Sequence, residues 1–225
     1  LHFLLYYVIS MCKREPLVIG VLDYGVGNIA SIVNILKKAG AKSILVNKVE
    51  DFDDVTMLIL PGVGSFDYGM KRLKESGLID RLNTLVLEDK LPILGICLGM
   101  QLMCKSSEEG IEDGLGWIDA EVKKFNFNLE CEKLKIPHMG WNDVFVKKDT
   151  GMASKHDTDK RFYFVHSYFV TCNEDKDVLF TSHYCKEFVA GFQKGNVIGL
   201  QFHPEKSHRF GLEILKRFIN LNAKI

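Results

Sequence analysis

One cysteine stands after a predicted strand in a setting that could make it a nucleophile. Residues 95–99 read Gly-Ile-Cys-Leu-Gly and follow an apolar run that begins at Leu91. Gly-x-Cys-x-Gly between a strand and a helix is typical of a nucleophile elbow, where the glycines leave room for a strained turn. A helix predicted from Leu98 to about Lys105 would favour the thiolate of Cys97. A buried structural cysteine fits the same residues, and this motif alone does not decide between the two.

A base for this thiol could come from residues 201–205, Gln-Phe-His-Pro-Glu. His203 ends an apolar run, and residues two apart in an extended chain point the same way, so Glu205 could orient its imidazole. Cys97, His203 and Glu205 would then form a Cys-His-carboxylate triad, which is defined by geometry rather than by chain order. By itself, a His-x-Glu sequence is more often a coincidence of the surface.

The elements that must position these residues alternate in the first half of the chain. Strands are predicted at residues 17–22, 43–46, 57–60 and 93–96, and helices at 29–39, 70–76 and 78–89. This alternation predicts an α/β fold with a doubly wound, mostly parallel sheet flanked by helices, whose sites form at the carboxyl ends of the strands. The turns that contain Gly25, Gly62 and Cys97 each follow a strand, so we expect them to meet along one edge.

The second half is predicted to add antiparallel strands to the same domain. Short alternating runs occur at residues 120–122, 142–146, 162–165, 168–170, 178–180, 188–192 and 197–202, and a final helix at 211–221. No repeat, low-complexity segment or linker interrupts them. We therefore predict one domain over residues 17–225 and an N-terminal extension over residues 1–16.

Composition excludes several classes of function. The 29 basic and 29 acidic residues balance, which argues against a nucleic-acid or acidic-membrane binder. The apolar start of the chain lacks the preceding basic region of a signal peptide and is about half a membrane span. The glycines at 25 and 27 lack a third glycine and a Walker lysine, so no nucleotide site is predicted. We expect no cofactor.

The six cysteines are scattered, at positions 12, 97, 104, 131, 172 and 185. They contain no Cys-x-x-Cys pair, which argues against zinc and thioredoxin-type sites, and no metal is expected. Their scatter along a chain of this length indicates reduced thiols and a cytoplasmic protein.

Taken together, the motifs resemble class I (triad-type) glutamine amidotransferases. The nucleophile motif Gly-x-Cys-x-Gly-x-Gln is matched at residues 95–101, the His-Pro-Glu motif at 203–205 and the oxyanion loop, Leu-Pro-Gly-Val-Gly, at 60–64. More narrowly, the chain is similar to the glutaminase subunit of imidazole glycerol phosphate synthase. His-Met-Gly-Trp-Asn at residues 138–142 is the most discriminating of the matching blocks.

This resemblance implies a role for each triad residue. Cys97 would attack the side-chain amide of glutamine, and hydrolysis of the resulting thioester would give glutamate and ammonia. His203 would take the thiol proton and pass a proton to the departing ammonia, while Glu205 would orient His203.

The resemblance also implies an oxyanion hole and a substrate site. Backbone N–H groups of Leu98 and of the loop at Val63 and Gly64 would bind the oxyanion, with a regulatory peptide flip in the loop; an ordinary tight turn is the alternative. The residues implied to bind substrate glutamine are Gln101, Ser167 and Tyr168. His166 is interpreted as a structural histidine.

A partner is implied as well. The glutaminase would form a heterodimer with a (β/α)₈-barrel synthase subunit, which receives ammonia through a channel and makes imidazole glycerol phosphate and AICAR in histidine biosynthesis. Asn28 and Lys206 are predicted to face this partner, and His138 and Trp141 fit either packing or function.

Three alternatives stay open. The family usually has Tyr-Gly where this chain has Tyr184-Cys185. This departure leaves room for a paralogue that supplies ammonia to an adenylating enzyme of surface-polysaccharide biosynthesis. The others are a non-catalytic subunit that activates its partner, which the intact triad argues against, and another elbow-cysteine hydrolase such as a thioesterase or γ-glutamyl hydrolase.

Overall fold

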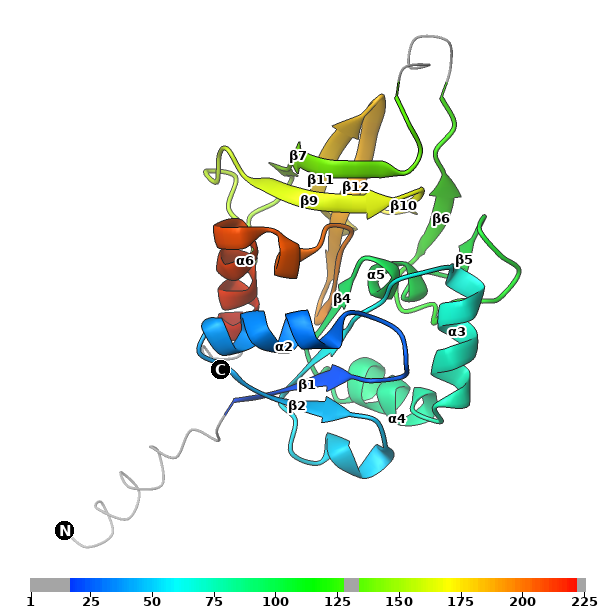
Figure 1. Cartoon of the computed structure of the whole chain (residues 1–225), viewed down its shortest axis with the longest axis vertical. Helices are drawn as coiled ribbons and strands as arrows, with labels where there is room; N and C mark the ends of the chain where they lie inside the picture. The colour runs from blue at the N-terminus through cyan, green and yellow to red at the C-terminus, as the bar shows by residue number, and fades with distance from the viewer. Residues whose placement is uncertain (1–16, 128–133, 222–225) are drawn as a thin grey trace, which may run out of the picture.

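The computed structural model describes residues 17–127 and 134–221 (Figure 1), so the predicted extension at 1–16 lies outside the described residues. An 11-stranded sheet forms the centre, in the order β2-β1-β3-β4-β13-β12-β10-β6-β5, with β11 and β8 continuing from β12. Its parallel part consists of β2 (Lys42–Val46), β1 (Val18–Leu22), β3 (Met57–Leu60), β4 (Ile93–Ile96) and β13 (Val197–Leu200).

The antiparallel part begins at β13, which runs parallel to β4 and antiparallel to β12. It contains β12 (Lys186–Lys194), β10 (Tyr168–Cys172), β6 (Ala120–Lys124), β11 (Val178–Tyr184) and β8 (Phe145–Val146), while the short β5 (Ser106–Ser107) pairs parallel to β6. The prediction of a mostly parallel sheet with antiparallel strands from the second half is confirmed.

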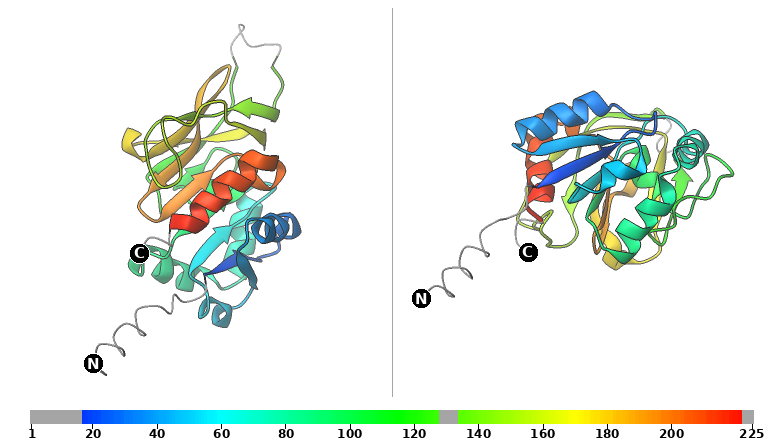
Figure 2. Two further views of the ribbon diagram at one scale, coloured as in Figure 1. Left: turned by 90° about the vertical axis from the view of Figure 1, so that its left-hand side faces the viewer. Right: turned by 90° about the horizontal axis from the view of Figure 1, so that it is seen from below.

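Helices cover both faces of the parallel strands because successive side chains of a strand point to opposite faces. In β3, Met57 and Ile59 belong to one hydrophobic cluster, whereas Leu58 and Leu60 belong to another. The first cluster includes side chains of α2 (Ile29–Lys38) and α6 (His208–Leu221). The second includes those of α3 (Phe66–Glu75), α4 (Ile79–Asn83) and α5 (Leu98–Leu102). Figures 1 and 2 show α2 and α6 together on one side and α3 on the other.

Several helix boundaries differ from the predictions. The helix predicted over 78–89 is α4 followed by a π-helical segment, Thr84–Glu88. The helix predicted to run to about Lys105 is α5, which ends at Leu102. Its last carbonyls instead accept hydrogen bonds from the following segment, since Leu115 N–H donates to Leu102 O and Ile118 N–H to Met103 O. A helix of five residues contributes little dipole to Cys97.

A separate two-stranded sheet lies beside the main one, whereas the sequence analysis predicted only antiparallel strands in the same domain. It pairs β7 (His138–Asp143) with β9 (Arg161–His166) and places His138 opposite His166. Phe162 stacks on Phe202 at 3.9 Å between ring centroids, and Phe164 contacts Phe188 edge-on. Aromatic packing therefore holds this small sheet against β12 and the end of β13. Short helical turns among the described residues are Val49–Phe52, Asp175–Asp177 and Pro204–Lys206.

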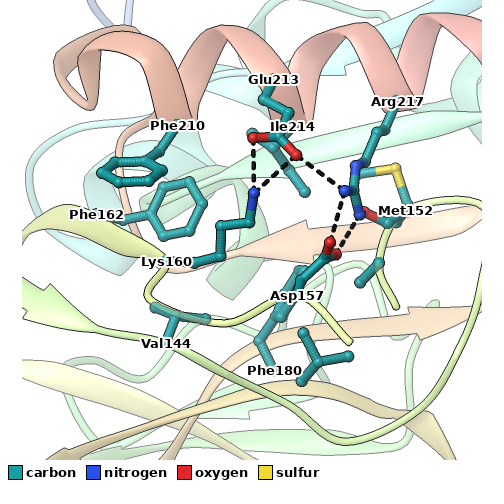
Figure 3. A pocket seen from close by; sticks show the side chains of 12 residues that line it. Val144, Met152, Asp157, Lys160, Phe162, Phe180, Phe210, Glu213, Ile214 and Arg217 are labelled. Atoms are coloured by element: carbon teal, nitrogen blue, oxygen red, sulfur yellow. Dashed lines mark hydrogen bonds and ion pairs between the residues drawn. The ribbon is translucent and has the colours of Figure 1, made fainter. Parts of the chain in front are cut away.

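The loop before β9 is tied to α6 by ion pairs at the rim of a small apolar cavity (Figure 3). Lys160 Nζ lies 2.7 Å from Glu213 Oε2, and Arg217 Nη2 lies 2.8 Å from both Glu213 and Asp157. The cavity has room of about 20 Å³, which is enough for about one water molecule. It is a packing feature of the α6 interface. Over the described ranges, no helix has the length and apolar character needed to cross a bilayer.

The described cysteines differ from one another. Cys97, Cys104 and Cys172 are free thiols, whereas Cys185 is disulfide-bonded, so the prediction of reduced thiols is wrong for Cys185. Spacing along the chain could not show this because proximity between cysteines depends on the fold. Burial raises the pKa of the Cys104 and Cys172 thiols, which makes both poor nucleophiles.

Candidate active site

A cavity of about 310 Å³ brings most of the predicted site residues together. Its lining includes Val63, Gly64, Cys97, Leu98, Gln101, Ser167, Tyr168, His203 and Lys206. Glu205 lies behind His203 and contacts its ring. Asn28 is absent from this lining; its side chain instead caps α2 by accepting a hydrogen bond from Ser31 N–H at 3.3 Å.

Cys97 occupies a strained turn between β4 and α5. Its backbone φ of 54° and ψ of −110° lie outside the regions that residues with side chains usually adopt. A Cβ at Gly99 would lie 1.9 Å from Leu60 O, and one at Gly95 would lie 2.8 Å from Gly99 O. Neither position can hold a side chain without moving backbone. The glycines therefore clear space for the turn, as the motif predicts.

His203 is held by Glu205 at the end of β13. His203 Nδ1 lies 2.7 Å from Glu205 Oε1, and both side chains are 2% exposed. Because a carboxylate only accepts, Nδ1 carries the proton and Nε2 is left to exchange one. Burial lowers the pKa of His203, but the nearby Cys97 and Glu205 outweigh it and raise the pKa to about 10. The Cys97 thiol lies near enough to His203 to raise its pKa through its charge and a side-chain contact, although among the described residues Nε2 has no partner of full hydrogen-bond geometry.

The loop after β3 packs directly on the start of α5. A Cβ at Gly62 would lie 2.7 Å from Gly99 N, so the two backbones are in contact. The hydroxyl of the buried Tyr24 donates to Pro61 O at 2.6 Å and anchors the loop from the β1 turn. Gly64, with a φ of +100°, supplies a conformation that glycine favours. The turns after β1, β3 and β4 thus meet at one edge of the sheet, as predicted.

Two polar residues at the site carry no assigned role in the sequence analysis. Gln201 is fully buried, accepts a hydrogen bond from Gln101 Nε2 at 3.0 Å, and places its own Nε2 3.8 Å from Cys97 Sγ. Glu109 lines the cavity, accepts a hydrogen bond from Phe66 N–H at 2.8 Å, and has a pKa raised by burial. Gln201 belongs to the His-Pro-Glu block and could have been singled out. Glu109 follows Ser-Ser-Glu, which is indistinguishable from an exposed polar turn.

Two other kinds of site find less support in the structure. A larger groove of about 660 Å³ runs along β10, β11 and β12, but the one thiol in its lining is Cys172, whose pKa is raised. Within residues 17–127 and 134–221, no group of three or more His, Cys, Asp or Glu side chains could hold a metal ion. The Cys97 cavity combines a thiol on a strained turn with a buried His–Glu pair, and it is the candidate active site.

Comparison with known proteins assigns the family. The family model described as "Glutamine amidotransferase class-I" matches residues 20–221. The chain belongs to the class I glutamine amidotransferase family. Among glutamine amidotransferases of curated function, it is 50% identical to imidazole glycerol phosphate synthase subunit HisH 2 of Methanococcus maripaludis, over 89% of this chain and 98% of that protein. It is 44% identical to imidazole glycerol phosphate synthase subunit HisH of Leptospira interrogans, over 90% of this chain and 100% of that protein.

Solved structures agree on the fold. A glutamine amidotransferase structure superposes with a TM-score of 0.68 at 23% identity, covering 92% of this chain and 99% of that one. PurLQS from Thermotoga maritima gives 0.71 at 20% identity, with coverage of 92% and 99%. At this identity the likeness concerns the arrangement of strands and helices alone.

Proposed function

We propose that this chain is the glutaminase subunit of an imidazole glycerol phosphate synthase. It hydrolyses glutamine to glutamate and ammonia, and the ammonia serves the synthase subunit that makes imidazole glycerol phosphate and AICAR. The observation that carries the proposal is Cys97 on its strained turn beside the buried His203–Glu205 pair. The similarity to HisH proteins over about nine-tenths of the chain supports this synthase in particular. The family match at 20–221 supports placing the domain at residues 17–225.

The chemistry proceeds through a thioester. Because the pKa of His203 is raised to about 10, its Nε2 already holds the proton of the Cys97 thiol when Cys97 Sγ attacks the side-chain amide carbon of glutamine. The C–N bond then breaks, and His203 returns the proton to the departing ammonia. Water, activated by His203, attacks the thioester carbon and releases glutamate and the Cys97 thiol. Glu205 keeps Nδ1 protonated throughout, so that Nε2 always faces the reaction.

The cavity walls supply binding and charge stabilisation. The Leu98 N–H and the N–H groups of the loop at Val63 and Gly64 stabilise the tetrahedral oxyanion. Gln101, Ser167 and Tyr168 bind the amino-acid end of glutamine. Glu109 is the carboxylate of the cavity lining and would pair with the α-ammonium group of the substrate.

The partner is proposed to be a (β/α)₈-barrel subunit that docks over the mouth of the cavity in the cytoplasm. Lys206 lines the cavity, and Pro137, also in its lining, directly precedes β7. On β7, Met139 is 62% exposed and Trp141 39% exposed, which are large apolar side chains for a free surface. We place this surface, together with Lys206 and Asn28, on the partner side.

The deciding experiment measures glutamate release from glutamine. The wild type is compared with Cys97→Ala, with and without a barrel synthase subunit and its nucleotide substrate. Cys172→Ala is the matched control, since it removes a free thiol outside the site. We expect release that depends on Cys97, is stimulated by the barrel subunit and survives in the control. Stimulation by an adenylating sugar enzyme in place of the barrel would instead establish the polysaccharide pathway, and release without Cys97 would refute the mechanism.

A further inference from the structure

Two buried histidines take no part in the chemistry above, although one of them, His166, lines the Cys97 cavity. His138 on β7 and His166 on β9 face each other across the small sheet, with His138 Nδ1 2.9 Å from His166 Nε2. They are 3% and 6% exposed. Such a contact needs one ring to donate and the other to accept, so its direction must be fixed by neighbours.

A backbone carbonyl fixes that direction. His166 Nδ1 lies 2.7 Å from Tyr168 O, which can only accept, so Nδ1 carries the proton of His166. Nε2 of His166 therefore accepts from His138 Nδ1. Nε2 of His138 then accepts from Asn142 Nδ2 at 3.1 Å, and the other hydrogen of Asn142 goes to His183 O at 2.9 Å. One choice of tautomers thus satisfies every hydrogen bond in this series.

The same carbonyl joins this series of hydrogen bonds to the active site. Tyr168 O also accepts from Gln101 Nε2 at 3.1 Å, and Gln101 donates its second hydrogen to Gln201 Oε1 at 3.0 Å. Gln201 Nε2 in turn faces Cys97 Sγ. Both hydrogens of the Gln101 amide are thus taken by the protein. What Gln101 presents to a ligand in the cavity is its amide oxygen, an acceptor suited to an N–H group of glutamine.

The surroundings keep both imidazoles neutral. His138 stacks on Tyr184 and Phe164, with ring centroids 4.1 and 4.9 Å apart, and Phe125 packs edge-on against it. Burial lowers the pKa of His138 to about 4 and that of His166 to about 3. An extra proton on either ring would place two N–H groups opposite each other and break this series of hydrogen bonds.

We propose that His138 and His166 are positioning residues, which form a neutral hydrogen-bond relay that holds the Tyr168 carbonyl and, through it, the Gln101 amide in the orientation that accepts glutamine. The proposal rests on the proposed glutaminase function and deepens it. Removing the relay leaves the chemical groups Cys97 and His203 in place, so the loss falls on glutamine binding.

The test measures how well glutamine protects Cys97 from iodoacetamide, read by peptide mass on the full chain alone and in complex with the barrel subunit. His166→Phe fits the aromatic surroundings but removes the donor to Tyr168 O. His166→Asn keeps a donor at the δ position. We expect the half-protecting glutamine concentration to rise about tenfold in His166→Phe, because a buried carbonyl loses a partner. The Asn variant should stay within about threefold of wild type, and exposed His156→Phe serves as control.

The outcomes separate this inference from the function on which it rests. Protection of wild-type Cys97 with an unchanged half-protecting concentration in folded His166→Phe overturns the relay, since a purely structural role lowers only the melting temperature. Absence of glutamine protection in the wild type refutes the glutaminase function itself. If His166→Phe does not fold, ¹⁵N NMR of the wild-type imidazoles still tests the proposed tautomers. We expect both rings neutral and protonated at Nδ1 near pH 6, and an Nε2-protonated His166 overturns the proposal.

Discussion

Two buried pairs, His203 with Glu205 and His138 with His166, lie near each other and differ in the protonation of their histidines. The pKa of His203 is raised to about 10, whereas that of His166 is lowered to about 3. Burial pushes both values down. The two histidines differ in the groups that contact their imidazole rings. His203 contacts a carboxylate and a thiol, while His166 contacts a second imidazole, a peptide carbonyl and aromatic rings. Burial alone therefore says little about a histidine, and its hydrogen-bond partners decide between proton transfer and positioning.

The largest expected difference between the two pairs is in turnover. His203→Phe should lower kcat for glutamine hydrolysis in the partner complex by at least about a thousandfold, because it removes the proposed base and acid of the reaction. His138→Phe, which leaves the reacting groups in place, should stay within about tenfold of wild type at saturating glutamine. Steady-state glutamate release measures both. Equal losses in the two variants would break the comparison.

Glu205→Gln tests which neighbour charges His203. The amide keeps the shape of the side chain but removes one of the groups that raise the pKa of His203. We expect kcat to fall about a hundredfold, since the ring loses its fixed tautomer. An NMR titration of the imidazole should show the pKa of His203 below the wild-type value. An unchanged titration would mean that Cys97 alone sets the charge.

The two pairs should destabilise the fold at opposite ends of the pH scale. His203 has a raised pKa, so the folded state holds its proton more tightly, and this stabilisation is lost as pH rises from about 6.5 through about 10. His138 and His166 have lowered pKa values, so stability is lost as pH falls from about 6.5 towards 4 and 3. Melting temperatures measured between pH 4 and 10 should fall by a few degrees at each end, giving an acid limb and an alkaline limb. Glu205→Gln should flatten only the alkaline limb.

The smallest expected effect concerns the aromatic surroundings of His138. Tyr184→Ala removes the ring stacked on His138 and admits water, so the pKa of His138 should rise towards its ordinary value. The acid limb of the stability profile would then move to higher pH. Tyr184→Phe is the matched control, since it keeps the ring and loses only the hydroxyl that donates to Lys135 O. A shift in both variants would show that the hydroxyl matters more than the ring.

The sequence predicts the catalytic half of this comparison and misses the other half. Gly-Ile-Cys-Leu-Gly can be recognised in the sequence because the local turn requires its glycines. Apolar runs likewise indicate the strands that lead to Cys97 and His203. The pairing of β7 with β9 in a sheet of its own depends on contacts far apart in the chain. His138 and His166 therefore remain two unrelated histidines until the fold places them opposite each other. Glu109 is missed for the same reason.

The backbone of Cys97 has a consequence for the protein as a whole. A residue with a side chain at φ 54° and ψ −110° costs of order 1–3 kcal/mol relative to a relaxed conformation. Glycine adopts such angles without that penalty. At alkaline pH, where the proton of His203 no longer adds stability, the inactive Cys97→Gly protein should therefore unfold at a higher temperature than the wild type. At this position the proposed catalysis and thermal stability favour different residues, so screening variants of this chain for heat resistance alone would select against the proposed nucleophile.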